Sequence, residues 1–172
     1  TYNSAVNAAL ISMERYPGRR VLVLDSLAAS SGYGLFMDRM ADLRDGGMDM
    51  EELFHWGELH RLELHHWFFS TDLSSYVRGG RITKAAGVFG GILGICPLLN
   101  MDNAGKLVPR EKIRSKKHVI RAIVDRMVEH AQNGVNYNGK CYISQSACLE
   151  DAQAVAELVE SRFPNLNGKV EI

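Results

Sequence analysis

The 172-residue sequence has no excess of either charge, few cysteines and no long apolar run. Its 20 basic side chains (Lys and Arg) balance its 20 acidic ones, so no global field attracts nucleic acid or an anionic membrane. The three cysteines, Cys96, Cys141 and Cys148, form no CxxC pair and no zinc-ligand spacing. No apolar stretch approaches the ~20 residues that cross a bilayer. We therefore expect a cytoplasmic chain with reduced thiols, no cofactor, no nucleic-acid partner and no stable membrane insertion.

Both ends of the sequence resemble the interior of a longer chain. Residues 1–15 have helical spacing, no initiator methionine before them and no signal-peptide pattern. Residues 169–172 look like the start of a strand. We therefore expect a fragment that is missing segments at both ends.

The spacing of apolar residues predicts alternating helices and strands. Arg20–Asp25 is a continuous apolar run typical of a strand buried on both faces, and Asp49 with Glu52 predicts a capping box at a helix start. Ser30 or Ser31 is the expected cap of the preceding helix. Helices are expected near residues 2–14, 31–45, 50–62, 82–91, 116–132 and 148–163, with a short one after residue 72, and further strands near residues 66–70, 95–100, 106–112 and 140–144.

This order indicates an α/β protein of two layers. The turn residues 102–105 predict a β-hairpin between the strands at 95–100 and 106–112. The alternating units give way to the hairpin layer near Trp67. We therefore predict part of one α/β domain over residues 1–66 and a second α/β domain, incomplete at its end, over 67–172, the latter with a hairpin and a mixed sheet.

The histidines and serines offer only weak signals for chemistry. His55, His60, His65 and His66 crowd one region, but His55 and His60 fall about 140° apart around a helix and no HExxH is present. We interpret the four as solvated histidines on a helix face and predict no metal site. No GxSxG or SxxK frames a serine, and the glycines of residues 87–94 match no phosphate-loop pattern.

The segment Arg78-Gly-Gly-Arg81 is the most unusual feature. Its two glycines permit a tight turn between helices, and two guanidiniums suited to bidentate contacts with a carboxylate or phosphate flank that turn. A surface turn with solvated arginines is about as plausible from these residues alone. The long apolar stretch that follows favours a buried ligand.

At these residues the sequence resembles the DegV family. Residues 76–86 (YVRGGRITKAA) and 90–99 (GGILGICPLL) resemble its central motif and the strand after it. Residues 1–5, 23–34 (VLDSLAASSGYG), 108–114 (VPREKIR) and 149–152 (LEDA) resemble other family segments in the family order. The likeness therefore covers nearly the whole chain.

The resemblance implies a two-domain carrier that is not an enzyme. Such a protein holds a long-chain fatty acid of the palmitate or oleate kind in a tunnel between its domains, and a separate fatty acid kinase phosphorylates the carboxyl group. The residues that the resemblance assigns to the tunnel wall are Ile82, Ala85, Ala86, Phe89, Ile92, Leu93 and Leu98. It places Thr1 and Ser4 near the head group, and it leaves Arg78 and Arg81 either orienting the anion or facing the kinase.

The sequence departs from the family at the head group. The threonine, serine and histidine that hold the carboxylate in the family belong to segments outside these 172 residues. Cys96 replaces the family lysine before the strand proline, and Gln145 replaces a histidine common before the last helix. The alternative to a carrier is an α/β enzyme that acts on a phosphorylated or acyl small molecule through its glycine-rich segment.

Overall fold

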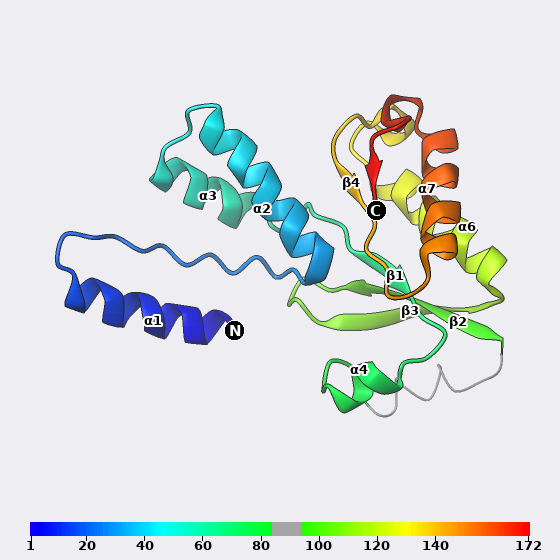
Figure 1. The fold of residues 1–172 in the computed structure, drawn as a ribbon, viewed down its shortest axis with the longest axis horizontal. Coiled ribbons are helices and arrows are strands. Elements are labelled where there is room, and N and C mark those ends of the chain that lie inside the picture. The colour runs from blue at the N-terminus through cyan, green and yellow to red at the C-terminus, as the bar shows by residue number, and fades with distance from the viewer. Residues whose placement is uncertain (84–93) are drawn as a thin grey trace.

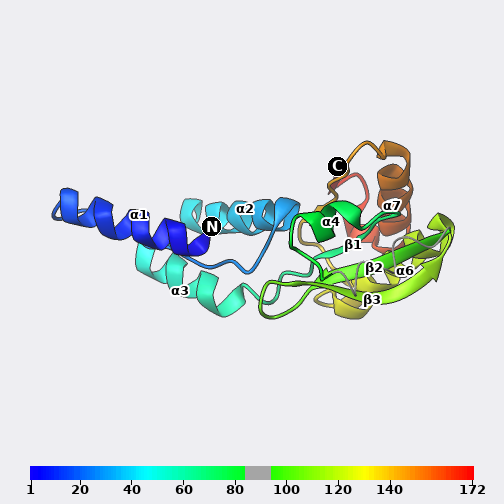
Figure 2. The same ribbon diagram turned by 90° about the horizontal axis from the view of Figure 1, so that it is seen from below.

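The computed structural model describes residues 1–83 and 94–172. A helical N-terminal region lies beside a region that contains the sheets, and α1 stands apart from the sheets in both views (Figures 1 and 2). The helical region also contains the extended connection 16–29. Among the described helices, none combines the length and apolarity that a bilayer crossing requires. The N-terminal helices are α1 (Tyr2–Arg15), α2 (Ser30–Asp45) and α3 (Met50–His60).

Local hydrogen bonds define the start of α3 as predicted. Asp49 Oδ1 accepts from the backbone N–H groups of Glu51 and Glu52, each at 2.9 Å, and Glu52 Oε2 accepts from Asp49 N–H at 3.2 Å. The capping box is therefore confirmed. The expected serine cap of α2 is wrong: its N-cap is Ala29, with no side-chain bond.

The strand predicted over Arg20–Asp25 is also wrong. The segment is extended, but neither sheet of the described residues includes it. An apolar run becomes a strand only where a neighbouring strand accepts its backbone hydrogen bonds. Leu24 instead packs against Gly57 of α3, where an added Cβ would lie 2.4 Å from Leu24 Cδ2.

The remaining elements form an antiparallel sheet, a parallel strand pair and the helices around them. The three-stranded sheet has the order β1-β2-β3, and β4 pairs with β5 in parallel. This confirms the α/β class and the hairpin. The expected mixed sheet is instead two sheets, one with antiparallel pairs and one with a parallel pair. The elements are β1 (Trp67–Phe69), α4 (Ser74–Arg78), β2 (Ile95–Met101), β3 (Leu107–Arg114), α6 (Lys116–His130), η2 (Gly134–Asn136), β4 (Cys141–Tyr142), α7 (Leu149–Arg162), η3 (Pro164–Leu166) and β5 (Val170–Glu171).

A β-bulge in the hairpin changes which face of the sheet β3 presents. Leu98 pairs with Glu111 and Leu99 with Pro109, so Arg110 is the extra residue. Before the bulge Leu107 packs on the α4 side of the sheet, and after it Ile113 packs on the α6 side. Residues 107 and 113 would share a face in a regular strand, because side chains alternate with a period of two. The bulge therefore reverses the alternation.

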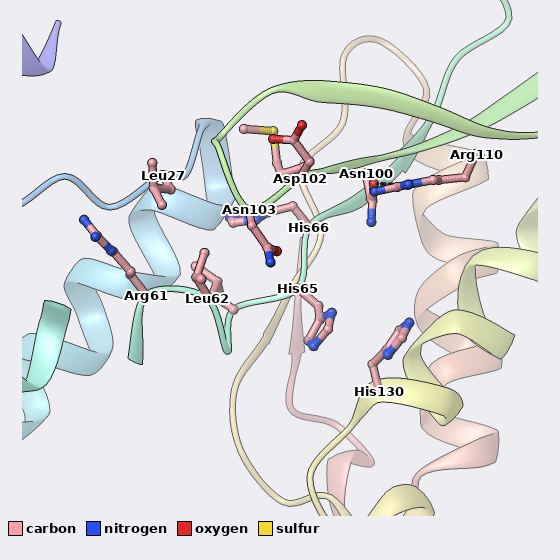
Figure 3. A pocket seen from close by; sticks show the side chains of 12 residues that line it. Leu27, Arg61, Leu62, His65, His66, Asn100, Asp102, Asn103, Arg110 and His130 are labelled. Carbon is pink, nitrogen blue, oxygen red and sulfur yellow. Dashed lines mark hydrogen bonds between the residues drawn. The ribbon is translucent and has the colours of Figure 1, made fainter. Parts of the chain in front are cut away.

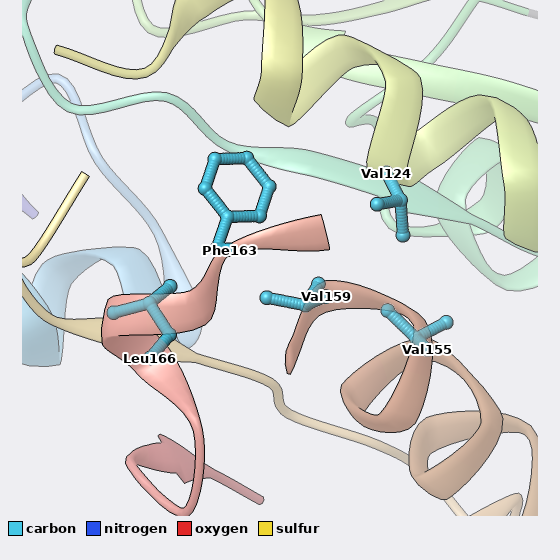
Figure 4. Close-up of a cluster of buried hydrophobic side chains, with 5 residues drawn as sticks. All are labelled: Val124, Val155, Val159, Phe163 and Leu166. Atoms are coloured by element: carbon cyan, nitrogen blue, oxygen red, sulfur yellow. The ribbon is translucent and has the colours of Figure 1, made fainter. Parts of the chain in front are cut away.

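Two apolar clusters cover the two faces of the sheet, with α4 on one side and α6 and α7 on the other (Figure 1). The α4-side core consists of the buried Leu73, Ile82 and Leu99 with Phe68, Tyr76 and Leu107. The α6-side core consists of the buried Cys96, Leu98 and Val119 with residues that include Trp67, Phe69 and Ile113. A third cluster joins α6 and α7 through Val124, Val155, Val159, Phe163 and Leu166 (Figure 4).

Polar contacts connect α2 to the strand pair. Lys140 Nζ forms ion pairs with Asp38 and, at 2.8 Å, with Asp42 one helical turn away. Tyr142 Oη donates to Asp38 Oδ2 at 2.7 Å, and the hydroxyls of Ser31 and Ser144 lie 2.9 Å apart. Hydrogen bonds from Lys140 and then Tyr142 lower the pKa of Asp38. We call Asp38, Asp42, Lys140 and Tyr142 the α2 clamp.

A glycine near the start of α2 allows a second contact between the regions. A Cβ added at Gly32 would lie 1.8 Å from His66 Cδ2, so the imidazole packs directly on the helix backbone. Gly34, two residues later in the same helix, has open space around it. Substitution of Gly32 therefore tests the contact with His66, whereas substitution of Gly34 tests helix propensity alone.

We expect opposite effects from alanine at these two positions. Gly32→Ala should lower the free energy of unfolding by about 1–3 kcal/mol, because the His66 ring must leave its place. Gly34→Ala should raise it by about 0.5–1 kcal/mol, since alanine is the better helix former. Urea unfolding of both variants measures this. Changes of the same sign would contradict the contact between His66 and α2.

We expect Lys140→Met to lower the midpoint of thermal unfolding, because it leaves two carboxylates one turn apart without their cation. The pKa of Asp38 is depressed in the folded protein, so its contribution is complete above the ordinary value of 3.8 and is lost as the pH falls through the folded pKa. The difference from the wild type should therefore be largest at neutral pH and shrink in acid. Lys117→Met, an exposed change on α6, is the control, and an equal shift there would refute the clamp.

Candidate ligand-binding site

The turn after α4 is a Schellman motif. Gly80 has φ +69° and its N–H donates to Val77 O at 3.0 Å, while Arg81 N–H donates to Tyr76 O at 2.9 Å. These are the two bonds that define the motif, and the left-handed conformation favours glycine at position 80. The two glycines of the sequence motif therefore end the helix and bring Arg81 back beside it.

Both arginines of this turn are exposed. Arg81 Nη1 donates to the carbonyl oxygen of Gly79, which holds its guanidinium against the turn. Asp72 precedes α4, and its Oδ1 accepts from the Ser74 hydroxyl at 2.6 Å and from Ser74 N–H at 2.8 Å. These hydrogen bonds lower the pKa of Asp72, with a smaller contribution from the charge of Arg78. The turn is thus an exposed cationic edge beside a carboxylate.

Ile82 follows the turn and is buried. Only 6% of its surface is exposed, and it packs in the α4-side core with Leu73 and Leu99. The charged turn and the apolar cluster are therefore adjacent, because the core residue Ile82 directly follows the exposed Arg81. The turn thus presents charge to solvent directly beside apolar surface.

Leu98 lies on the other face of the sheet. It is fully buried in the α6-side core, where it packs with Cys96 and Val119. Burial raises the pKa of the Cys96 thiol, which favours its neutral form, and a thiol in either form cannot supply the positive charge of the family lysine. The structure thus separates Leu98 from Ile82, although both were assigned to one tunnel wall.

The other predicted site residues lie elsewhere. Thr1 is the N-cap of α1 and Ser4 is in its first turn, and both are exposed. In both views a gap separates the N-terminal end of α1 from α4 (Figures 1 and 2). The described residues therefore do not bring Thr1 and Ser4 to the arginine turn. The five remaining predictions lie outside the described residues: Ala85, Ala86, Phe89, Ile92 and Leu93. The same holds for most of the helix predicted over 82–91 and for the glycines at 87–91.

The histidines do not all lie on a helix face. His55 and His60 belong to α3, but His65 and His66 follow it, in the connection to β1, so the helix-face interpretation is wrong for these two. The imidazole of His65 stacks on that of His130 from α6, with ring centroids 4.5 Å apart and planes at 9°. His130 is 65 residues away, so sequence spacing gave no signal of this pair. Within the described ranges, no three His, Cys, Asp or Glu side chains group to hold a metal.

Comparison with known proteins identifies the family. The model described as an uncharacterised protein of the DegV family matches residues 1–171. A DegV domain-containing protein of Clostridium perfringens is 31% identical over 165 residues, which are 95% of this chain and 56% of that protein. The chain therefore spans little more than half the length of this relative.

Solved structures share the fold. The Streptococcus pneumoniae fatty acid kinase B3 protein, loaded with linoleic acid, is 25% identical with a TM-score of 0.85, over 99% of this chain and 59% of that one. A DegV-family protein of Ruminococcus gnavus with vaccenic acid is 28% identical with a TM-score of 0.83, over 94% and 57%. The family match over residues 1–171 and the Clostridium relative show that this chain belongs to the DegV family.

Proposed function

We propose that the protein is a fatty-acid carrier and not an enzyme. It binds a long-chain fatty acid in a tunnel between its two domains and presents the carboxylate to a fatty acid kinase in the cytoplasm. The single observation that carries the proposal is the fold shared with the pneumococcal kinase B3 protein, which contains linoleic acid, at a TM-score of 0.85 over 99% of this chain.

The division of the chain at Trp67 supports a ligand site between two parts. Residues 1–66 form the helical region, and residues 67–172 begin with β1 and form both sheets. The α4-side core lies beside the arginine turn, and residues 84–93 begin three positions after Arg81 in the sequence. We propose that the apolar wall is formed by Ile82, Ala85, Ala86, Phe89, Ile92 and Leu93. Leu98 contributes indirectly, because it packs on the α6 side and so holds β2 in place. Thr1 and Ser4 lie near the head group in this proposal.

Apolar burial alone supplies ample binding energy for such a ligand. An acyl chain that buries ~14 methylenes at ~0.8 kcal/mol each gains roughly 11 kcal/mol before the costs of ordering. A carboxylate at the end of the slot needs hydrogen-bond donors, because an unpaired buried charge is costly. The family assigns those donors to segments outside this sequence, so these 172 residues must hold the ligand through burial of its acyl chain.

The exposure of Arg78 and Arg81 supports a kinase-facing role. A guanidinium that binds a ligand carboxylate inside a tunnel would be shielded from water, whereas both of these lie at the surface. Arg81 is also held against Gly79 O. We propose that the two arginines contact the kinase and do not hold the fatty acid.

Purified protein should carry lipid. Native mass spectrometry with organic extraction is expected to reveal a fatty acid of ~14–18 carbons, in keeping with the burial estimate. A protein that remains at 19.2 kDa after addition of oleate or palmitate would contradict carriage by this chain. Saturable turnover of a phosphorylated or acyl compound that survives repurification would instead favour the enzyme alternative.

Arg78→Gln should separate lipid binding from presentation. We expect unchanged lipid content and roughly tenfold slower phosphorylation by the kinase at limiting carrier, since ~1.4 kcal/mol of lost contact is a tenfold change. Arg44→Gln is the control, because Arg44 pairs with its own neighbour Asp45 on α2. Loss of bound lipid in Arg78→Gln would show that this arginine orients the anion.

A further inference from the structure

A small pocket opens where β1 begins and the β2–β3 hairpin turns. Its volume is about 130 Å³, and its walls come from the connection after α3, the hairpin and the end of α6 (Figure 3). Of the residues predicted for the lipid site, none that the structure describes lines it. Its polar lining includes Arg61, His65, His66, Asn100, Arg110 and His130.

The lining is cationic although the chain is neutral overall. Two arginines and three histidines face one carboxylate, that of Asp102. Asp102 Oδ1 is engaged by the hairpin turn, where it accepts from Ala104 N–H and Lys106 N–H at 2.9 Å each. These bonds lower the pKa of Asp102, that from Lys106 most strongly. The carboxylate therefore stays charged, and it interacts with Arg110. Two guanidiniums against one carboxylate still leave the pocket with net positive charge.

The bulge of β3 directs Arg110 toward the pocket. Arg110 is the extra residue of the bulge, and its Nε donates to Asn100 Oδ1 at 2.7 Å (Figure 3). This bond uses one of the five guanidinium hydrogens and orients the group. Bulges commonly redirect a side chain at functional sites. A fixed guanidinium is the donor best matched to a phosphate or carboxylate.

The histidines complete the set of donors. His65 and His130 face each other in a near-parallel stack (Figure 3), so their in-plane lone pairs do not converge on one metal ion. Burial and then the charge of His130 lower the pKa of His65, and burial and then His65 lower that of His66. His66 Nε2 is buried against Gly32 of α2 and has no hydrogen-bond partner among the described residues, so this nitrogen does not serve as a donor to the pocket. An anion would compensate the mutual repulsion of these rings when they are protonated.

We propose that this pocket binds a small oxyanion, a phosphate group held by Arg110, His65 and His130. The pocket volume of about 130 Å³ accommodates a group of this size. Arg61 contributes charge from the opposite wall while its Nη1 donates to Asp25 O at 2.9 Å. The site is independent of the lipid proposal, because the two use different residues.

Titration of the wild-type protein with inorganic phosphate tests the site through the imidazole resonances in NMR spectra. We expect saturable shifts of His65, His66 and His130 and a rise in the pKa of His65, none of which sodium chloride of equal ionic strength reproduces. Glycerol 3-phosphate distinguishes the source: tighter binding than inorganic phosphate would assign a phosphate carried by a larger molecule, and equal or weaker binding would assign the free ion. Linear shifts shared with chloride would overturn the proposal.

Variants locate the anion. Arg110→Gln should weaken phosphate binding roughly tenfold, the effect of one lost charged hydrogen bond. Arg114→Gln, at the exposed end of the same strand, is the matched control and should bind as the wild type does. His130→Gln on α6 provides a second test that leaves the hairpin unchanged and should also weaken binding. Unchanged affinity in both Arg110→Gln and His130→Gln would refute the site.

Discussion

Burial of β2 on both faces is the constraint on which the rest of the structure depends. Cys96, Pro97, Leu98 and Leu99 are all buried within this one strand. Because neighbouring side chains of a strand point to opposite faces, Leu98 must be covered by α6 while Leu99 must be covered by Leu73 and Ile82. Each face requires its own layer, so the sheet lies between α4 and α6 and the arginine turn is held against it.

The bulge at Arg110 is the second consequence of this arrangement. A regular β3 would place residues 107, 111 and 113 on one face, yet Leu107 is needed in the α4-side core and Ile113 in the α6-side core. One extra residue satisfies both cores. It also leaves Arg110 without a pairing partner and directs it to Asn100, so the packing requirement produces the polar site at the sheet edge.

Prediction from sequence succeeded where the information is local. The capping box needs only Asp49 and Glu52, and the hairpin turn needs only residues 102–106, so both follow from short-range spacing. It failed where a distant partner decides the outcome. Residues 20–25 have the composition of a strand but no strand beside them, and the His65–His130 stack joins segments that no periodicity relates. Leu98 illustrates the same limit. Alternation along the strand predicts that Leu98 and Leu99 face opposite sides of the sheet, but it does not predict which side would contact a ligand.

The two proposed sites are adjacent through β2 but need not compete. Leu99 belongs to the core beneath the arginine turn, and the next residue, Asn100, orients Arg110 toward the histidine pocket. Consecutive residues of a strand face opposite sides, so a ligand on the α4 side leaves the pocket side unobstructed. β1 also connects them, since Phe68 belongs to the α4-side core and His66 lines the pocket. Because β2 is buried on both faces and bonded to β1 and β3, its close packing resists displacement, which favours independent occupancy of the two sites.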